Sequence, residues 1–334
     1  MVGVMATIKD VAKEAGVSVA TVSRVINRNG YVQEETRKLV EAAISKLNYL
    51  PNEVARSLYF QKSKLIGLII PDITNPFFPE IARGVEDVLQ QNGYRLIIGN
   101  SDEDAEKEVR YIETFTQHNV LGVISTSSEE VSQWEKLNIP VVLLDRIHHD
   151  FPFVCSDQKE GGRLAAQILL DRGSRNITLL RGPKHVRTAY ERFFAALEVL
   201  GKSQVQFQVL NTSFSFDGAL ETAGKLFELY PDTDGVIAVN DIVASAVLRE
   251  ALRRGRKIPE EMQIIGFDDI PMSKFLFPAL STIQQPAYEM GKEAAKLLLE
   301  RIRQADIKKK QIILPVSFVE RETTRKAGDG TWQK

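Results

Sequence analysis

Cysteine is almost absent from this sequence, and so are long hydrophobic runs. The single cysteine, Cys155, excludes a framework of internal disulfide bonds and any zinc site built from cysteines, and we expect it to be a small buried apolar side chain. No apolar run approaches the roughly 18 residues that a membrane-spanning helix needs. The N-terminus lacks the basic start and apolar core of a signal peptide. These absences favour a reduced, cytoplasmic setting.

Motifs of catalysis and cofactor binding are missing as well. The sequence contains neither the Gly-x-x-x-x-Gly-Lys-Ser/Thr phosphate loop nor the Gly-x-Ser-x-Gly nucleophile elbow. Gly161-Gly162 lacks the spacing of a dinucleotide-binding fingerprint. His148-His149-Asp150 suggests a metal site, but adjacent histidines point apart on a helix or strand. We therefore expect no enzymatic activity, no cofactor and no bound metal.

What is present is an ordinary globular composition with an uneven distribution of charge. Of the 334 residues, 43% are apolar and 26% are charged, which is typical of two or three folded domains. Residues 1–64 carry ten Lys and Arg against six Asp and Glu, a net charge of +4, whereas the remainder carries a net charge of -5. This contrast suggests that only the N-terminal part meets a polyanion.

The N-terminal segment has the pattern of three short helices without strands. Thr7-Ile-Lys-Asp10 has the form of a capping box, and apolar residues then recur at helical intervals. Gly16 should end this first helix, Ser18 should cap a second one, and Asn29-Gly30 should separate the second helix from a third. Two helices joined by a tight turn containing glycine are typical of a helix-turn-helix.

The residue pattern of the second helix predicts that it is a recognition helix, which enters the major groove of DNA. Its apolar face would be buried, which leaves Val19, Ala20, Thr21 and Arg24 outward. Arg24 can donate two hydrogen bonds to a guanine, worth about 1–3 kcal/mol of discrimination, while hydroxyl and amide side chains suit phosphate contacts. The alternative from spacing alone is a small three-helix interaction domain with a solvated charged face.

From residue 65 onward, short aliphatic runs alternate with longer amphipathic segments. This alternation predicts an α/β fold with a doubly wound parallel sheet, and about eight units imply two lobes. The expected strands are Leu65–Ile70, Tyr94–Gly99, Val120–Ser125, Val141–Leu144, Ile177–Leu180, Val205–Leu210, Val236–Val239 and Ile264–Phe267.

Residues just past these strands are candidates for a ligand site, because ligands bind at the carboxyl ends of strands in such sheets. Aromatic faces suit the C–H face of a sugar ring, and the polar side chains suit a neutral polyhydroxylated ligand. A stacked purine would fit the same description. The candidates are Asn75, Phe77, Phe78, Asp145, Arg146, Arg192, Asn240, Asp268 and Gln285, with Phe214 and Phe216 as further candidates for the cleft wall.

Several of these candidates also have plain structural interpretations. Asp145-Arg146 would be worth little as a surface ion pair. Phe77 would serve equally as a core residue. Asn240-Asp241 would serve as the cap of the following helix. From position alone these alternatives stay open.

Three segments near the N-terminus carry a strong resemblance to the LacI/GalR family of bacterial transcription repressors. They are Thr7-Ile-Lys-Asp-Val-Ala, Ala15-Gly-Val-Ser-Val-Ala-Thr-Val-Ser-Arg-Val-Ile-Asn27 and Leu47-Asn-Tyr-Leu-Pro-Asn-Glu-Val-Ala-Arg-Ser-Leu58. The match is long, ordered and nearly without gaps. The resemblance implies DNA contacts from Thr7, Val19, Ala20, Thr21, Ser23, Arg24, Asn27, Tyr31, Asn52, Ala55 and Leu58.

The resemblance also implies how the parts are organised. Residues 1–50 would form a helix-turn-helix head, residues 51–64 a hinge helix and linker, and residues 65–334 a two-lobed sugar-binding and dimerisation domain. A hinge of about nine residues is too short to be stable alone and would fold on DNA. Leu58 matches the apolar wedge that opens a base step in the minor groove; a plain linker leucine is the alternative. Two hinges imply a homodimer on a pseudo-palindromic duplex operator.

Residues 65–325 resemble the periplasmic sugar-binding fold on which this family builds its sensor. Within the family, the resemblance is closest to the ribose-responsive branch of Gram-positive bacteria, which implies ribose or a close pentose or phosphorylated relative as effector. The chain departs from that branch at Ile147–Phe153 and Lys159–Gly162, which puts the effector more in doubt than the fold. The expected mechanism is release of the operator when a sugar binds between the lobes. A co-repressing purine, another sugar operon and a sugar-binding transport protein are the alternatives.

Overall fold

The computed structural model of the chain describes residues 6–49, 63–126, 134, 139–148, 150–303 and 310–326. The chain divides into two compact units, Met1–Ser63 and Lys64–Lys334, which we call the head and the body.

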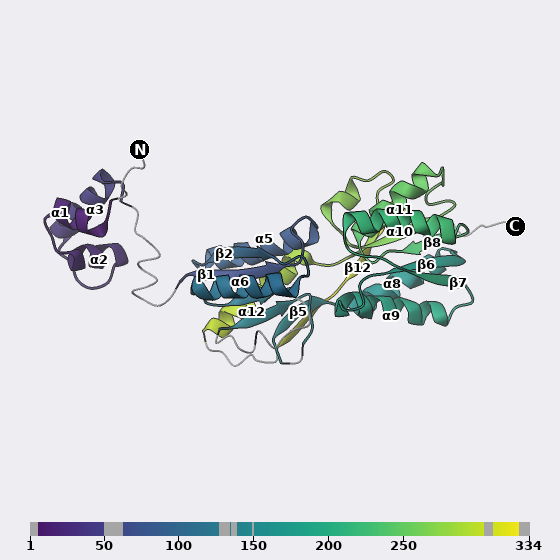
Figure 1. The fold of residues 1–334 in the computed structure, drawn as a ribbon, viewed down its shortest axis with the longest axis horizontal. Coiled ribbons are helices and arrows are strands. Elements are labelled where there is room, and N and C mark those ends of the chain that lie inside the picture. The colour runs from purple at the N-terminus through teal and green to yellow at the C-terminus, as the bar shows by residue number, and fades with distance from the viewer. Residues whose placement is uncertain are drawn as a thin grey trace. The chain divides into compact units, whose positions relative to one another are not determined.

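The head is a bundle of three helices, α1 (Ile8–Ala15), α2 (Val19–Asn27) and α3 (Glu34–Lys46) (Figure 1). The predicted capping box at Thr7 is confirmed, and Gly16 ends α1 in the left-handed conformation, with a φ of 66°. The predicted cap of α2 is confirmed too, because the Ser18 hydroxyl accepts a hydrogen bond from the Thr21 backbone N–H. The buried core of the head is made mostly of small apolar side chains together with one tyrosine, namely Val11, Ala12, Val22, Val25, Val40, Ala43 and Tyr49.

The body consists of two lobes, each built on a six-stranded sheet. The first lobe has the strand order β11-β5-β4-β3-β1-β2. Its elements are β1 (Leu65–Ile70), α5 (Phe77–Gln91), β2 (Arg95–Asn100), α6 (Ala105–Gln117), β3 (Val123–Ser125), β4 (Val141–Leu144), β5 (Phe153–Ser156), α12 (Ala287–Ile302) and β11 (Gln311–Leu314). Side chains of β1 alternate between its two faces: Ile66 and Leu68 join the cluster with α5 and α12, and Ile69 joins the cluster with α6.

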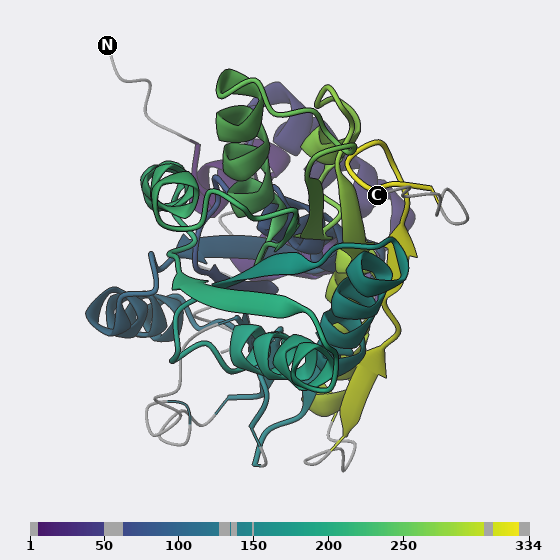
Figure 2. The ribbon, with the colours of Figure 1, turned by 90° about the vertical axis from the view of Figure 1, so that its right-hand side faces the viewer.

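The second lobe has the strand order β12-β10-β9-β8-β6-β7. Its elements are α8 (Gln158–Asp171), β6 (Asn176–Arg181), α9 (Arg187–Gly201), β7 (Gln206–Asn211), α10 (Phe216–Leu229), β8 (Gly235–Ile237), α11 (Asp241–Arg253), β9 (Gln263–Asp268), the 3₁₀ turn η1 (Pro271–Lys274), β10 (Ser281–Gln284) and β12 (Ser317–Val319). Figure 2 shows helices on both sides of this sheet, with α8 and α9 on one side and α10 and α11 on the other.

The chain passes between the lobes at three places in the described part of the body. The first crossover runs from β5 to α8, the second from β10 to α12, and the third from β11 to β12. Because each crossover is short, the lobes are tied together along one edge, and a cavity between them opens at the carboxyl ends of the strands.

All eight predicted strands are confirmed, with shifts of their ends; for example, the run Val120–Ser125 holds a strand only at its last three residues. Four strands were not predicted: β5, β10, β11 and β12. The predicted doubly wound parallel α/β body is confirmed, and one of its edge strands, β12, pairs antiparallel with β10. This short, half-exposed edge strand lacks the continuous apolar run of a central parallel strand.

Cys155 lies on β5 and is 1% exposed, as predicted for a buried small apolar side chain. Burial raises the pKa of its thiol to about 12. The thiolate form is therefore scarce at neutral pH, and the thiol is unreactive.

Candidate functional site

The predicted DNA-facing residues of the head lie on the surface of α2 and around it. Val22 and Val25 are buried, while Ala20 and Arg24 are exposed and Val19 is 41% exposed. The outward stripe predicted for a recognition helix is therefore present. Thr7 and Tyr31 are exposed, and Thr21, Ser23 and Asn27 are partly buried.

Two of the polar side chains on α2 are already engaged with each other. The Asn27 side-chain amide donates to the Ser23 backbone carbonyl at 2.9 Å and to its hydroxyl at 3.2 Å. This bond fixes both side chains on the helix surface. The predicted contacts at Asn52, Ala55 and Leu58, and the hinge helix itself, lie outside the described residues and stay predictions.

In the body, the structure brings all nine predicted ligand residues together around one cavity of about 340 Å³. They come from both lobes and from the second crossover. Asn75, Phe77, Phe78, Asp145 and Arg146 belong to the first lobe, Arg192, Asn240 and Asp268 to the second, and Gln285 to the crossover. The volume lies at the small end of the range for ligand pockets. A role in binding is an expectation for each of these residues.

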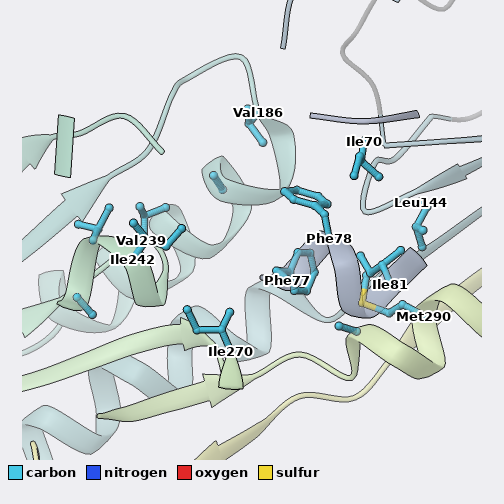
Figure 3. Packing of buried hydrophobic residues seen from close by; sticks show 14 of the residues in the cluster. Ile70, Phe77, Phe78, Ile81, Leu144, Val186, Val239, Ile242, Ile270 and Met290 are labelled. Carbon is cyan, nitrogen blue, oxygen red and sulfur yellow. The ribbon is translucent and has the colours of Figure 1, made fainter. Parts of the chain in front are cut away.

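Two phenylalanines at the start of α5 form the apolar part of the cavity wall. The rings of Phe77 and Phe78 meet edge to face, with centroids 5.2 Å apart. Figure 3 shows them on the side of α5 where Val186, Val239 and Ile270 of the second lobe lie. Both rings are buried and also belong to the main apolar cluster, so each serves as core and as cavity wall.

Of the two further aromatic candidates, only one lies at the cavity. Phe214 is among its lining residues. Phe216 is absent from that lining and is 51% exposed on the first residue of α10. The expectation that Phe216 walls the cleft is therefore wrong.

Two acids, one from each lobe, face the cavity from strained backbone positions. Asp145 directly follows β4 and has a φ of 53°, and Asp268, the last residue of β9, has a φ of 113°. Such conformations cost about 1–3 kcal/mol each and concentrate at functional sites. Burial raises the pKa of Asp145, while Arg146 and Arg192 oppose the rise. Burial also raises the pKa of Asp268 well above its usual value, again against the pull of Arg192.

The ion pair between Asp145 and Arg146 is buried rather than superficial. Their nearest side-chain atoms are 3.1 Å apart, with 7% and 12% of the two side chains exposed. Arg146 also donates to the Asp145 backbone carbonyl at 2.8 Å. The surface-pair interpretation is therefore wrong, and the guanidinium holds the acid in place at the cavity wall.

Arg192 is held by an aromatic ring and a backbone carbonyl. Its guanidinium carbon lies 3.9 Å from the centroid of the Phe267 ring, and Nη1 donates to the Val239 carbonyl at 2.6 Å. Among the described residues, its buried Nε has no hydrogen-bond partner. Burial lowers the pKa of Arg192. A Cβ at Gly162 would lie 2.0 Å from the Arg192 carbonyl oxygen, so glycine there lets α8 approach α9 and fix this arginine.

Two amide side chains of the site, those of Asn240 and Asn75, are oriented by backbone N–H groups two or three residues further along the chain. The Asn240 side-chain oxygen accepts from the Val243 N–H at 2.9 Å and caps α11. The Asn75 side-chain oxygen accepts from the Phe77 N–H at 3.1 Å. The cap interpretation of Asn240 is thus confirmed, and it is compatible with a binding role. With the oxygen engaged, each NH₂ group remains as a donor for a ligand.

The cavity has polar lining residues that the sequence did not indicate to us, chiefly Asp72, Asp102, Glu103, Thr188, Ser213 and Ser215. Thr188 is 1% exposed, and among the described residues its hydroxyl has no hydrogen-bond partner. It lies one helical turn before Arg192 on α9, so the i, i+4 spacing from a predicted residue was the available signal.

Next to Asn240, Asp241 is buried outside the cavity lining. Its carboxylate accepts from the Ile270 N–H at 2.9 Å, the Ser273 hydroxyl at 2.7 Å and the Thr282 hydroxyl at 2.6 Å. It therefore ties the start of α11 to η1 and β10. Burial raises its pKa to about 7 despite these bonds.

This shift predicts a pH dependence of stability. Because the carboxyl has a pKa of 3.8 when unfolded and about 7 when folded, the folded protein binds more protons between these values, and stability falls as pH rises across that window. At about 1.4 kcal/mol per pKa unit, the full effect is roughly 4 kcal/mol. Asp241→Asn does not titrate, so the wild type should lose stability relative to this variant from about pH 4 to 7 in chemical denaturation.

Asp232→Asn, a change at an exposed acid, is the control and should leave the pH profile unchanged. The quantity compared is the free energy of unfolding of the wild type minus that of Asp241→Asn. If this difference is constant from about pH 4 to 7, or increases as pH rises, the buried carboxyl is ionised in the folded protein.

Two further features concern the described residues only. No helix among them is long and apolar enough to cross a membrane. No group of three or more His, Cys, Asp or Glu side chains among them is placed to hold a metal ion; His149 lies outside this part of the chain.

A three-helix head with an exposed second helix, followed by a two-lobed α/β body with a polar cavity, defines the class of ligand-responsive bacterial DNA-binding regulators. Residues 7–52 match the family described as bacterial regulatory proteins, lacI family, and residues 166–324 match the periplasmic binding protein-like domain. The ribose operon repressor of Bacillus subtilis (strain 168) is 59% identical over 324 residues, covering 96% of this chain and 99% of that protein. The chain therefore belongs to the LacI family.

Solved structures agree with this assignment. The lac repressor dimer bound to operator and the anti-inducer ONPF is 26% identical, with a TM-score of 0.87 over 96% of this chain and 99% of that one. A LacI family transcriptional regulator from Enterococcus faecalis V583 with bound ribose is 32% identical, with a TM-score of 0.71 over 78% of this chain and 98% of that one.

Proposed function

We propose that this protein represses a ribose-utilisation operon: it binds a pseudo-palindromic operator as a homodimer and releases it when ribose binds between the lobes of the body. The observation that carries the proposal is the 59% identity to a ribose operon repressor along nearly the whole of both chains. Head and body are both included in that match, so the DNA-binding part and the sensing part are inherited together. A regulator of this kind acts on DNA in the cytoplasm and has no enzymatic activity, cofactor or metal.

The chemistry of the cavity supports a small neutral sugar. Asp145 and Asp268 offer carboxylate acceptors, and Asn75, Asn240 and Arg192 offer donors, all within a volume of about 340 Å³. Hydroxyl groups both donate and accept, so a pentose satisfies both sets at once. The edge-to-face pair of phenylalanines supplies an apolar surface for the C–H side of the ring.

The head supports sequence-specific binding to a duplex. α2 presents Val19, Ala20 and Arg24 outward on an otherwise buried bundle, which is the arrangement of a helix that enters the major groove. Arg24 is the residue to which we assign direct readout of a guanine. Thr21, Ser23 and Asn27 would contact phosphates and set the register.

A patch on the second lobe supports dimer formation. Met272 is 52% exposed, Phe275 is 86% exposed and Phe277 is 88% exposed, all within six residues around η1. Three large apolar side chains at this exposure are costly on a monomer and mark a contact surface. We assign this patch to a second copy of the chain, because a two-fold operator requires a two-fold repressor.

The effector acts by preferring one arrangement of the lobes. A ligand shifts an equilibrium only by its difference in affinity for the two states, and couplings of about 1–3 kcal/mol are typical. Ribose held by acids from both lobes favours the arrangement that brings them closer. We infer that this arrangement separates the two heads of the dimer from their half-sites.

Fluorescence anisotropy of a labelled operator tests the proposal. The duplex is the one that the full-length protein selects from a random pool, and D-ribose, ribose 5-phosphate, other pentoses and purines are added one at a time. We expect D-ribose to weaken binding and the purines to have no effect. Stronger binding in the presence of a purine, or no response to any of these ligands, would overturn the assignment of ribose as inducer.

Asp268→Asn should give a repressor that holds DNA but no longer responds. Asparagine has nearly the same shape as aspartic acid but carries an NH₂ donor in place of a carboxyl oxygen, and a buried polar group left without a matching partner costs about 1–3 kcal/mol. We expect calorimetry to show ribose affinity reduced roughly 10- to 150-fold, with operator affinity unchanged when ribose is absent. Wild-type ribose affinity would remove Asp268 from the binding site.

A further inference from the structure

A chain of buried side chains joins the two lobes behind the cavity. It runs from Asp145 of the first lobe through Gln158 and Gln285 to Asp268 of the second lobe, with Ser156 as a side branch. All five side chains are buried. Its two ends line the cavity, whereas Ser156 and Gln158 are not among the cavity residues. The chain of side chains therefore connects cavity-lining acids of opposite lobes.

The middle of this chain lies on the crossovers, where any relative movement of the lobes must occur. Ser156 ends β5 and Gln158 begins α8, so both belong to the first crossover. Gln285 lies between β10 and α12, in the second crossover. Gln285 accepts a hydrogen bond from the Ser156 hydroxyl and donates to the Asp268 carboxylate at 2.6 Å.

The amide nitrogen of Gln158 faces more acceptors than it can serve. It lies 2.7 Å from the Ser156 hydroxyl oxygen, 2.8 Å from the Gln285 side-chain oxygen and 3.5 Å from a carboxylate oxygen of Asp145. An NH₂ group has two hydrogens, and the two shorter bonds use them. The contact to Asp145 is therefore the weakest of the three, and it is a few tenths of an ångström too long for a good bond.

The amide oxygen of Gln158, in contrast to the nitrogen, lacks a hydrogen-bond partner among the described residues. It is buried, and burial without a partner is unfavourable in a protein interior. An amide with a surplus of acceptors at one end and none at the other is poorly satisfied as it stands. Such a group gains readily from a change of partners.

Movement of the lobes relative to each other changes the distance between the Asp145 carboxylate and the Gln158 amide. Asp145 follows the last residue of β4 in the first lobe, whereas Gln158 starts the first helix of the second lobe. A ligand that draws Asp145 and Asp268 towards each other moves Asp145 relative to Gln158. The amide can then give up one crossover acceptor and bond to Asp145 instead.

We propose that Gln158 is a positioning residue that couples occupancy of the cavity to the arrangement of the lobes, by exchanging a crossover hydrogen bond for one to Asp145. The inference rests on the proposed function and deepens it, since it names the element that transmits the effector signal. Gln158 itself is not among the residues that line the cavity.

The test compares two buried glutamines. Gln158→Met keeps the length of the side chain and removes its donors. Gln263→Met is the matched control: Gln263 is also fully buried, donates to the Ser174 hydroxyl at 2.8 Å and the Arg172 carbonyl at 3.2 Å, and lies within the second lobe, away from the crossovers. For each full-length variant, operator affinity is measured with and without saturating D-ribose, together with the melting temperature.

The readout is the factor by which ribose weakens operator binding, for which roughly 5- to 150-fold is typical. We expect Gln158→Met to reduce this factor to about 1–2, and Gln263→Met to keep the wild-type factor while lowering the melting temperature. By reciprocity, the effect of operator on ribose affinity should vanish in the same variant. A wild-type factor in Gln158→Met, or an equal loss in Gln263→Met, would overturn the inference.

Wild-type protein separates this inference from the proposed function. If ribose has no effect on operator binding by the wild type, the proposed function fails before any variant is compared. If Gln158→Met does not fold, Ser156→Ala replaces it, because removal of that acceptor frees the Gln158 donor for Asp145 without ligand. We expect Ser156→Ala to lower the coupling factor at least threefold, and an unchanged factor would again overturn the inference.

Discussion

Arg24→Ala is expected to abolish specific operator binding. A bidentate arginine–guanine pair contributes about 1–3 kcal/mol of discrimination, and a dimer makes the contact once in each half-site. The expected loss is therefore roughly 2–6 kcal/mol, or about 30-fold to more than 10⁴-fold in affinity at fixed salt. The exposed position of Arg24 on α2, opposite the buried Val22 and Val25, means that the fold of the head should survive the change.

Electrophoretic mobility shifts at one salt concentration, on the selected operator and on a scrambled duplex, measure this effect. Lys38→Ala is the control, because it removes one positive charge from an exposed position on α3. We expect Lys38→Ala to lower the affinity for both duplexes slightly and by the same factor. We expect Arg24→Ala to remove the preference for the operator over the scrambled duplex, while the affinity for ribose stays normal. An Arg24→Ala protein that still prefers its operator would show that another residue reads the sequence.

The double variant that combines Phe275→Glu with Phe277→Glu should be monomeric. Its loss of operator affinity should be comparable to that of Arg24→Ala. Carboxylates at two of the most exposed apolar positions of the body would face each other across a two-fold contact and remain unpaired. A monomer binds one half-site only, so its affinity should approach that of non-specific binding, about 10³-fold or more weaker than specific binding.

Light scattering coupled to size exclusion gives the mass, and anisotropy gives the operator affinity. Leu229→Glu, at the 58% exposed end of α10, is the control and should remain dimeric. We expect the double variant to bind ribose normally, since neither phenylalanine lines the cavity. A double variant that is still dimeric at micromolar concentration would place the dimer contact elsewhere on the chain.

Where the sequence predicted the site well, the reason is topological. The ends of parallel strands converge on one edge of each sheet, so residues such as Asn75, Asp145 and Asp268, which are far apart in the chain, were expected to gather and do line one cavity. The caps at Thr7 and Ser18 were predictable because their bonds reach only a few residues along the chain.

The features that the sequence did not predict depend on contacts between residues far apart in the chain. The pairing of β12 with β10 depends on the chain returning to the edge of a sheet after crossing between lobes. Gln158 is 2% exposed, yet its sequence position suggests an ordinary first turn of a helix. One of its partners, Gln285, lies more than a hundred residues away, so the network around Gln158 is visible only in the folded chain. Thr188 was also missed, although its i, i+4 spacing from Arg192 on α9 was an available signal.

The proposed function requires the cavity in the body and the DNA surface of the head to be energetically coupled. Calorimetric titration of D-ribose into the full-length protein, alone and saturated with operator duplex, tests it most directly, because coupling between two sites is reciprocal. We predict that operator weakens ribose binding by the same factor by which ribose weakens operator binding. Equal ribose affinities with and without operator would contradict the account.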